Sequence, residues 1–289
     1  MKIKKGDIVG RKSYGKDILF VVERIINQTN FKAIAILKGL NIRIQADSFL
    51  DDLEIIDKKT LQESQKKVEK RFIQTINKCV KGQDESKQEY LKRSNKIVYT
   101  GKILHLDGDK RYAEKSSLFY KKMGLRAVVR SVTESRQPAV VSGLIERYKP
   151  DILVITGHDG MIKGGTGYYD IYNYRNSKYF IQSVKMARNT RASKPNLVIF
   201  AGACQSYYEE LIQAGANFAS SPARILIDFI DPLIVAERVA TTDYTKYITI
   251  QDIEDELRDG QRGVNGIGAR GKKQILEIWN TLCRNVMQL

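Results

Sequence analysis

The sequence predicts an α/β protein in which a mainly parallel sheet is flanked by helices and preceded by a small β unit. Two short apolar runs, residues 152–155 and 197–200, are rich in β-branched side chains and do not alternate with polar ones. Such runs are typical of strands that are buried on both faces of a parallel sheet. A glycine-rich loop and a helical pattern over residues 178–189 separate them. The unit is therefore β-loop-α-β, with its two strands parallel.

Residues 1–57 predict a small N-terminal β domain. Short strand-forming runs alternate there with turn signals such as Lys38-Gly39. The runs are residues 7–10, 18–23, 31–37 and 42–46. Several short strands joined by tight turns indicate an SH3-like barrel. A docking module and a module that binds nucleic acid or peptides are equally compatible with this pattern.

Residues 58–96 have a different character and predict a basic helical linker. They hold 12 lysines and arginines against 5 acidic residues, and apolar side chains recur at helical spacing. We expect one amphipathic helix, a polar joint at residues 82–86, and a second short helix that ends near Arg93. A solvated helix that packs through its apolar stripe is favoured over a contact with RNA or an anionic surface.

From residue 97 onward, strand and helix patterns alternate, which predicts one α/β domain over residues 97–289. Its first strand covers residues 96–106 and ends at the acidic pair Asp107 and Asp109. The other predicted elements are a strand over 126–129 and helices over 111–123, 135–148, 228–239 and 272–287.

The composition limits the classes of function. The formal charge of +16 favours acidic partners without naming one. Three cysteines and two histidines match no zinc spacing and no disulfide framework, so we expect no metal and no organic cofactor. The N-terminus lacks the apolar centre of a secretory signal, and no apolar run approaches the about 18 residues of a membrane span. We therefore expect a soluble cytoplasmic protein.

Each apolar run of the β-loop-α-β unit is followed by a reactive side chain, His158 after the first and Cys204 after the second. The carboxyl ends of parallel strands are where ligands bind in open α/β sheets. A thiol beside an imidazole is a candidate nucleophile with its acid and base, and a helix predicted over residues 205–214 would favour the thiolate. A buried structural cysteine is the alternative. His105 lies inside a strand, where a core role is favoured.

The strand before His158 and the strand before Ala203-Cys204 resemble those of the caspase-like cysteine peptidases, in which a strand ending in histidine precedes a strand ending in Ala-Cys. The separation of 204 − 158 = 46 residues is close to the spacing of about 50 in that arrangement. Over essentially its full length the chain is similar to the YabG family of sporulation-specific proteases. The resemblance rests on residues 4–9, on Thr156-Gly157-His158-Asp159-Gly160 and on Gly202-Ala203-Cys204-Gln205-Ser206.

The resemblance implies a caspase-like sandwich and an endopeptidase that cuts spore-coat and germination-related proteins after basic residues, arginine especially. It also implies action in the mother cell during sporulation, while association with the spore coat and autoprocessing stay open. In caspase-like enzymes glycine follows the histidine and its N–H helps to bind the oxyanion. Here Asp159 occupies that position, so its N–H must serve, together with that of Cys204, while its side chain points away.

A preference for arginine requires a carboxylate at the same edge of the sheet. Asp107 and Asp109 end the strand over 96–106, an arrangement that resembles basic-specific relatives such as metacaspases. Asp228 and Asp231 are further candidates. Two other functions remain open from the residues: a nucleic-acid-binding protein that uses the basic helix and the SH3-like module, and a cysteine enzyme other than a peptidase, such as an acyltransferase.

Overall fold

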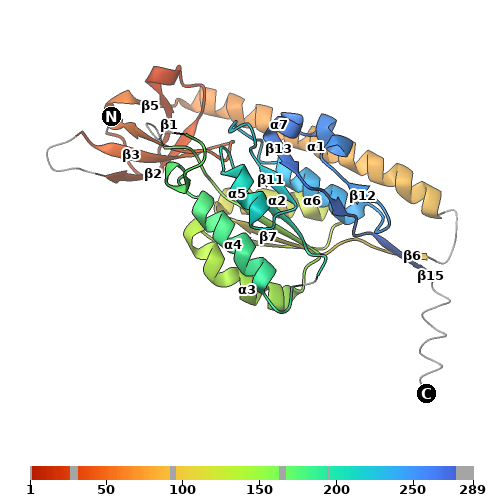
Figure 1. Ribbon diagram of the computed structural model, residues 1–289. Coiled ribbons are helices and arrows are strands. Elements are labelled where there is room, and N and C mark those ends of the chain that lie inside the picture. The colour runs from red at the N-terminus through yellow and green to blue at the C-terminus, as the bar shows by residue number, and fades with distance from the viewer. Residues whose placement is uncertain (1, 27–31, 92–95, 163–166, 194, 278–289) are drawn as a thin grey trace.

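The computed structural model describes residues 2–26, 32–91, 96–162, 167–193 and 195–277. Its centre is a six-stranded sheet with helices on both faces, and a second, five-stranded sheet lies at one end (Figure 1). A long helix, α1, runs along the molecule from the smaller sheet.

The central sheet is largely parallel, as the sequence predicts. Its strand order is β13-β11-β10-β9-β7-β8, and every neighbouring pair is parallel except β11 with β13. The strands are β7 (Ile103–Asp107), β8 (Ala127–Ser131), β9 (Ile152–Thr156), β10 (Val198–Ala201), β11 (Phe218–Ser220) and β13 (Val264–Gly266). The two apolar runs of the sequence are thus the adjacent strands β9 and β10, at the middle of the sheet.

Successive residues of β9 point to opposite faces, and each face has its own core. Val154 packs with residues of α1, α2 and α6, whereas Leu153 and Ile155 pack with residues of α3, α4 and α5. The helices are α1 (Lys58–Leu91), α2 (Lys110–Lys122), α3 (Gln137–Tyr148), α4 (Ser177–Asn189), α5 (Tyr208–Gln213), α6 (Asp231–Thr241) and the short α7 (Gly260–Gly263). The result is a three-layer α/β/α arrangement, with burial on both faces as expected of apolar strands without alternation.

The N-terminal strands form an antiparallel sheet with the order β4-β3-β2-β1-β5. They are β1 (Ile8–Arg11), β2 (Phe20–Ile26), β3 (Ile34–Gly39), β4 (Gln45–Phe49) and β5 (Leu53–Ile55). The predicted SH3-like barrel is not confirmed, since no ladder joins the outer strands β4 and β5 in the described part of the chain. The division into domains at residues 57 and 96 stays a prediction.

Two of the predicted helical segments differ from the structure. Helix α1 continues through the expected polar joint at residues 82–86, so one helix replaces the predicted two. Its apolar stripe is confirmed, because Phe72 and Ile76 are buried and Phe72 packs against Phe229. The predicted helix over 272–287 is wrong at its start, where residues 274–277 form a strand, and residues 278–289 lie outside the described part.

Four further strands lie outside the two main sheets. β6 (Lys96–Tyr99) pairs antiparallel with β15 (Gln274–Glu277), and the two-residue strands β12 (Tyr247–Ile248) and β14 (Ala269–Arg270) pair with each other. The predicted strand over 96–106 is therefore two strands, β6 and β7. Short 3₁₀ turns complete the structure at Lys12–Tyr14, Leu50–Asp52, Glu134–Arg136, Ile171–Asn173 and Gln251–Glu256. In the described residues no helix combines the length and apolarity of a membrane span.

Candidate active site

His158 and Cys204 lie at the same edge of the central sheet. In the parallel register of β9 and β10, Ile155 faces Ala201, and each candidate residue follows three positions later. The strands are hydrogen-bonded neighbours, so their carboxyl ends open at one place, as the sequence predicts.

The loops that follow β9 and β10 each donate a backbone N–H to the same carbonyl oxygen. The N–H of Asp159 and the N–H of Cys204 both donate to the carbonyl oxygen of Arg43, at 3.1 Å and 3.2 Å. These are the two N–H groups that the sequence suggests for an oxyanion hole. Their convergence on a single peptide oxygen is the arrangement required to polarise a carbonyl group.

The segment that contains Arg43 pairs with backbone on both of its sides, as an added β-strand would. Ile42 forms an antiparallel bridge with Asp228, and Ile44 forms a parallel bridge with Asp159. The N–H of Gln45 donates to the carbonyl of Asp159 at 2.7 Å. A Cβ atom at Gly160 would lie 2.3 Å from the Gln45 carbonyl oxygen, so this close approach requires glycine there.

The side chain of Arg43 is fully buried and ends at Asp107. The Arg43 Nη1 donates to Asp107 Oδ2 at 2.7 Å, and both side chains are inaccessible to solvent. Burial opposes ionisation of Asp107, but the Arg43 guanidinium outweighs it and holds the pKa of that carboxyl well below its usual range. The Arg43 guanidinium also lies over the Tyr112 ring, 4.8 Å from its centroid. The Arg43 guanidinium thus lies between a carboxylate and an aromatic ring, both of which suit a guanidinium.

The other acidic candidates have different partners. Asp109 caps α2 and binds Arg111, and its Oδ2 lies 3.8 Å from His158 Nε2. Asp228 pairs with Arg71 at 2.8 Å. Asp231, the second further candidate, is buried and accepts the N–H groups of Asp228 and Arg258. Among these four, Asp107 is the one with an ion pair to Arg43 in the described structure.

His158 is fully buried. Its Nε2 lies 3.2 Å from the carbonyl oxygen of Gly39, and its ring stacks on Tyr112 with the centroids 5.4 Å apart. Its Nδ1 is buried without a hydrogen-bond partner in the described residues. Burial lowers the pKa of His158 to about 3, so the imidazole is neutral at pH 7 in this state.

Cys204 is also fully buried, and its environment differs from the predicted one. Its Sγ accepts the N–H of Ile227 at 3.3 Å, and burial raises the pKa of the thiol to about 12. The predicted helix from residue 205 is wrong at its start, because α5 begins only at Tyr208. The left-handed φ of Gln205, 53°, is incompatible with helix there. The six-residue α5 therefore does not place its first turn on the thiol, and in this closed state the thiol is neutral.

Two other expectations about side chains are met. The carboxylate of Asp159 points away from the shared carbonyl: it accepts the N–H of Gly160 at 2.9 Å and that of Asn176 at 2.8 Å. His105 is a core residue, buried between the hydroxyls of Tyr120 and Thr156 at 3.1 Å and 2.8 Å. In the ranges that the structure describes, no group of three or more histidine, cysteine or acidic side chains is arranged to hold a metal ion.

Sequence reasoning missed two residues of the site, Arg43 and Glu134. Glu134 is buried before α3; its Oε1 accepts the N–H of His158 at 2.8 Å and lies 3.9 Å from His158 Nδ1. Nothing in the local sequence of Glu134 indicates this role, since the contact spans 24 residues. Arg43 offered one signal, a charged residue between two isoleucines in a predicted strand.

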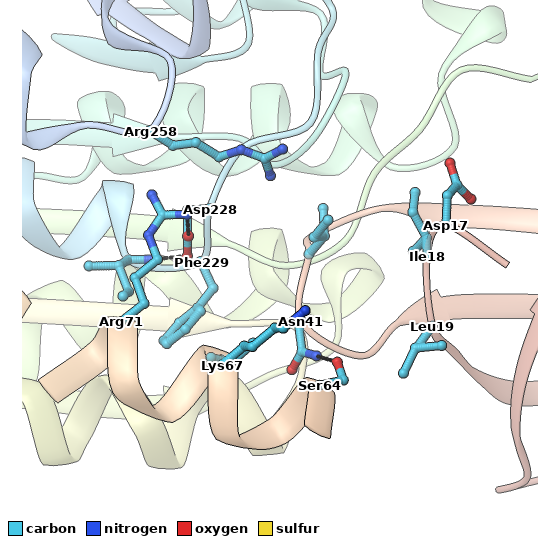
Figure 2. A pocket seen from close by; sticks show the side chains of 13 residues that line it. Asp17, Ile18, Leu19, Asn41, Ser64, Lys67, Arg71, Asp228, Phe229 and Arg258 are labelled. Carbon is cyan, nitrogen blue, oxygen red and sulfur yellow. Dashed lines mark hydrogen bonds and ion pairs between the residues drawn. The ribbon is translucent and has the colours of Figure 1, made fainter. Parts of the chain in front are cut away.

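A cavity of about 310 Å³ opens on the N-terminal side of Arg43, next to Asn41 and Ile42 (Figure 2). Figure 2 shows Asn41 bonded to Ser64 of α1, and Arg71 of α1 paired with Asp228. Helix α1 and the segment around Asp228 thus border this cavity.

Comparisons with known proteins show the family to which the chain belongs. The chain matches the family described as YabG peptidase U57 over residues 4–276. It is 37% identical over 285 residues to the sporulation-specific protease YabG of Bacillus subtilis (strain 168), an alignment that covers 95% of this chain and 98% of that protein. No solved structure matches the chain. With the family matched over most of its length and a relative aligned nearly end to end, the chain belongs to the YabG peptidase family and is a peptidase.

Proposed function

We propose that this peptidase is a cysteine endopeptidase that cuts after basic residues, arginine preferred, by means of Cys204 and His158. The observation that carries the proposal is the shared carbonyl. Two backbone N–H groups, one from the residue after the imidazole and one from the thiol residue itself, donate to the same peptide oxygen at 3.1 Å and 3.2 Å. A peptide bound with its carbonyl at that position lies at the carboxyl ends of both β9 and β10.

The chemistry follows from this position. The Cys204 thiolate attacks the carbonyl carbon, and the N–H groups of Asp159 and Cys204 hold the oxygen as it becomes an oxyanion. His158 takes the thiol proton and gives it to the leaving amine, and water then hydrolyses the thioester. Burial keeps both the thiol and the imidazole neutral, so His158 is able to accept the thiol proton as the sulfur attacks.

Selectivity for arginine follows from Asp107. A fully buried carboxylate 2.7 Å from a guanidinium nitrogen supports a pocket for a basic side chain, because an uncharged group there would leave the carboxylate unpaired. Asp109 Oδ2 lies 3.8 Å from His158 Nε2, and the backbone of Asp228 bridges that of Ile42, the residue before Arg43. We propose Asp107 as the recognition residue, with Asp109 and Asp228 as supporting residues.

The biological substrates are proposed from the relatives. The relative is described as a sporulation-specific protease, and we propose spore-coat and germination-related proteins as the substrates, in the mother cell during sporulation and at the spore coat. Nucleic-acid binding, the alternative from the basic helix, has no specific structural observation in its favour.

The test is cleavage of a peptide with one arginine by wild-type protein, Cys204→Ala, Cys204→Ser and His158→Ala. We expect each variant to keep its fold by circular dichroism and to lose at least about 10³-fold in kcat/KM. Cys79→Ala is the matched control, because Cys79 is a buried cysteine on α1 that packs in a different apolar cluster from Cys204. Wild-type turnover by Cys204→Ala would refute the proposal, as would alkylation that inactivates the enzyme without labelling Cys204.

A further inference from the structure

We propose that residues 39–46 are an intramolecular pro-segment: they occupy the substrate cleft with Arg43 in the P1 position, hold the enzyme latent, and are cut in cis between Arg43 and Ile44. The proposal rests on the peptidase function proposed above. It identifies the first substrate of the cleft as a part of the same chain.

The backbone of the segment is bound as a peptide substrate would be. Ile42 bridges Asp228 on one side and Ile44 bridges Asp159 on the other, which is recognition by strand addition. The Arg43 carbonyl oxygen lies between them, on the two N–H groups of the proposed oxyanion hole. The bond presented to Cys204 is therefore the peptide bond between Arg43 and Ile44.

The side chain of Arg43 is better explained by recognition than by stability. It is fully buried, and apart from Nη1 its guanidinium nitrogens Nε and Nη2 have no hydrogen-bond partner in the described residues. Desolvation of a buried ion pair largely cancels its attraction, so an apolar residue would serve a structural core as well. An arginine bound by Asp107 is expected if the pocket is the specificity pocket and Arg43 is its ligand.

The same segment closes the site. Gly39 accepts from His158 Nε2 at 3.2 Å, and Ile44 belongs to the apolar cluster that contains Cys204. With the segment in place, the exposed fraction of both His158 and Cys204 is 0%. No external peptide reaches the thiol until these residues leave.

The proposed cut is a balanced hydrolysis. Cys204 Sγ bonds to the Arg43 carbonyl carbon, the C–N bond to Ile44 breaks, and His158 transfers the thiol proton to the new Ile44 amine. Water then cleaves the thioester, giving the Arg43 carboxylate and restoring the thiol. The cut separates β3, which ends at Gly39, from β4, which begins at Gln45. Fragment 1–43 is then held to the rest of the chain by the hydrogen bonds of β3 with β4 and of β1 with β5, and its departure uncovers His158 and Cys204.

The experiment follows activation from a defined starting time. Full-length protein is refolded by dilution from denaturant, and hydrolysis of an arginine peptide is recorded while fragments are identified by mass and N-terminal sequence. For wild type we expect a lag, with a first-order rate independent of protein concentration, and a fragment that begins at Ile44. The Cys204→Ala protein is expected to give neither the fragment nor turnover.

The side-chain anchor is tested with Arg43→Ala, Arg43→Lys and the matched control Arg24→Ala, an exposed arginine of β2 in the same sheet. We expect Arg43→Ala to show no fragment at Ile44 and an initial rate about thirtyfold or more above that of wild type, because one partner of the buried pair is gone. Arg43→Lys and Arg24→Ala should keep the lag and the fragment.

The two proposals fail in different ways. Peptide cleavage at full rate from the start by wild type, with no fragment at Ile44 and with Arg43→Ala unchanged, overturns the pro-segment and leaves the peptidase intact. A lag that shortens in proportion to protein concentration overturns the cut in cis. Peptide cleavage that survives in Cys204→Ala overturns the proposed function itself.

Discussion

Replacement of Asp107 by asparagine separates recognition of the basic side chain from catalysis. The substitution keeps the size of the side chain and its acceptor for the N–H of Asp109, which lies 2.9 Å from Oδ1. It removes the charge that faces Arg43 Nη1 at 2.7 Å and replaces the accepting oxygen with an NH₂ donor. Donor then faces donor in a pocket without solvent, so a guanidinium loses its partner.

The magnitude follows from burial. Both members of the pair are 0% exposed, so solvent does not screen them. Loss of one partner of a buried pair costs about 3–5 kcal/mol, which corresponds to about two to four orders of magnitude in rate. We therefore expect kcat/KM for an arginine peptide to fall by at least about 10²-fold, and that for a glutamine peptide to stay constant or rise.

The assay is kcat/KM for three peptides that differ only in the residue before the scissile bond: arginine, lysine or glutamine. Asp228→Asn is the comparison, because this supporting carboxylate pairs with Arg71 at 2.8 Å and not with Arg43. We expect it to change the ratio of arginine to glutamine cleavage less than about fivefold, as is usual for a partly screened pair. An Asp107→Asn enzyme that kept the wild-type ratio would show that the guanidinium is recognised elsewhere.

Two further predictions concern buried acids. Glu134→Ala removes the acceptor of the backbone N–H of His158, so we expect kcat to fall about 10- to 100-fold with KM little changed. Glu134→Gln keeps an acceptor oxygen and should restore most of the lost kcat. Steady-state kinetics measure both values, and a wild-type kcat in Glu134→Ala would contradict the positioning role. Burial, aided by the charge of Asp228, raises the pKa of Asp231 to about 7 from 3.8. The folded state thus binds this proton more tightly than the unfolded chain does. Proton binding by Asp231 therefore contributes up to about 4 kcal/mol to the free energy of unfolding below pH 4, and this contribution is lost as the pH rises through 7. Urea unfolding at pH 4.5 and pH 8 should therefore show a smaller pH difference for Asp231→Asn than for wild type, and equal differences would refute the assignment.

Local patterns were sufficient for the central layer and for the position of the reactive groups. The apolar runs at 152–155 and 197–200 became adjacent parallel strands, because strands without alternation must be covered on both faces and a helical crossover makes them parallel. Once the strands are neighbours, His158 and Cys204 share an edge. The choice of these two residues therefore needed only sequence, although their catalytic role stays a prediction.

Contacts between distant parts of the chain decided which residues pack around His158 and Cys204. Residues 42–44 read locally as the start of a strand, yet they leave the N-terminal sheet and pair with Asp159 and Asp228, over 100 residues away. Arg43 meets Asp107 across 64 residues of sequence. No local pattern reports such a pairing, because the two residues meet only when distant parts of the chain pack together.

The sequence by itself thus determined which elements form the sheet and which thiol and imidazole stand at its edge, since strand burial and crossover direction are properties of short stretches. Only the tertiary structure decided that Asp107 is the carboxylate paired with a guanidinium, that Cys204 and His158 are buried and neutral, and that the Arg43 carbonyl oxygen accepts the N–H groups of Asp159 and Cys204. These features depend on solvent exclusion, which arises only when the N-terminal sheet and the α/β layers meet.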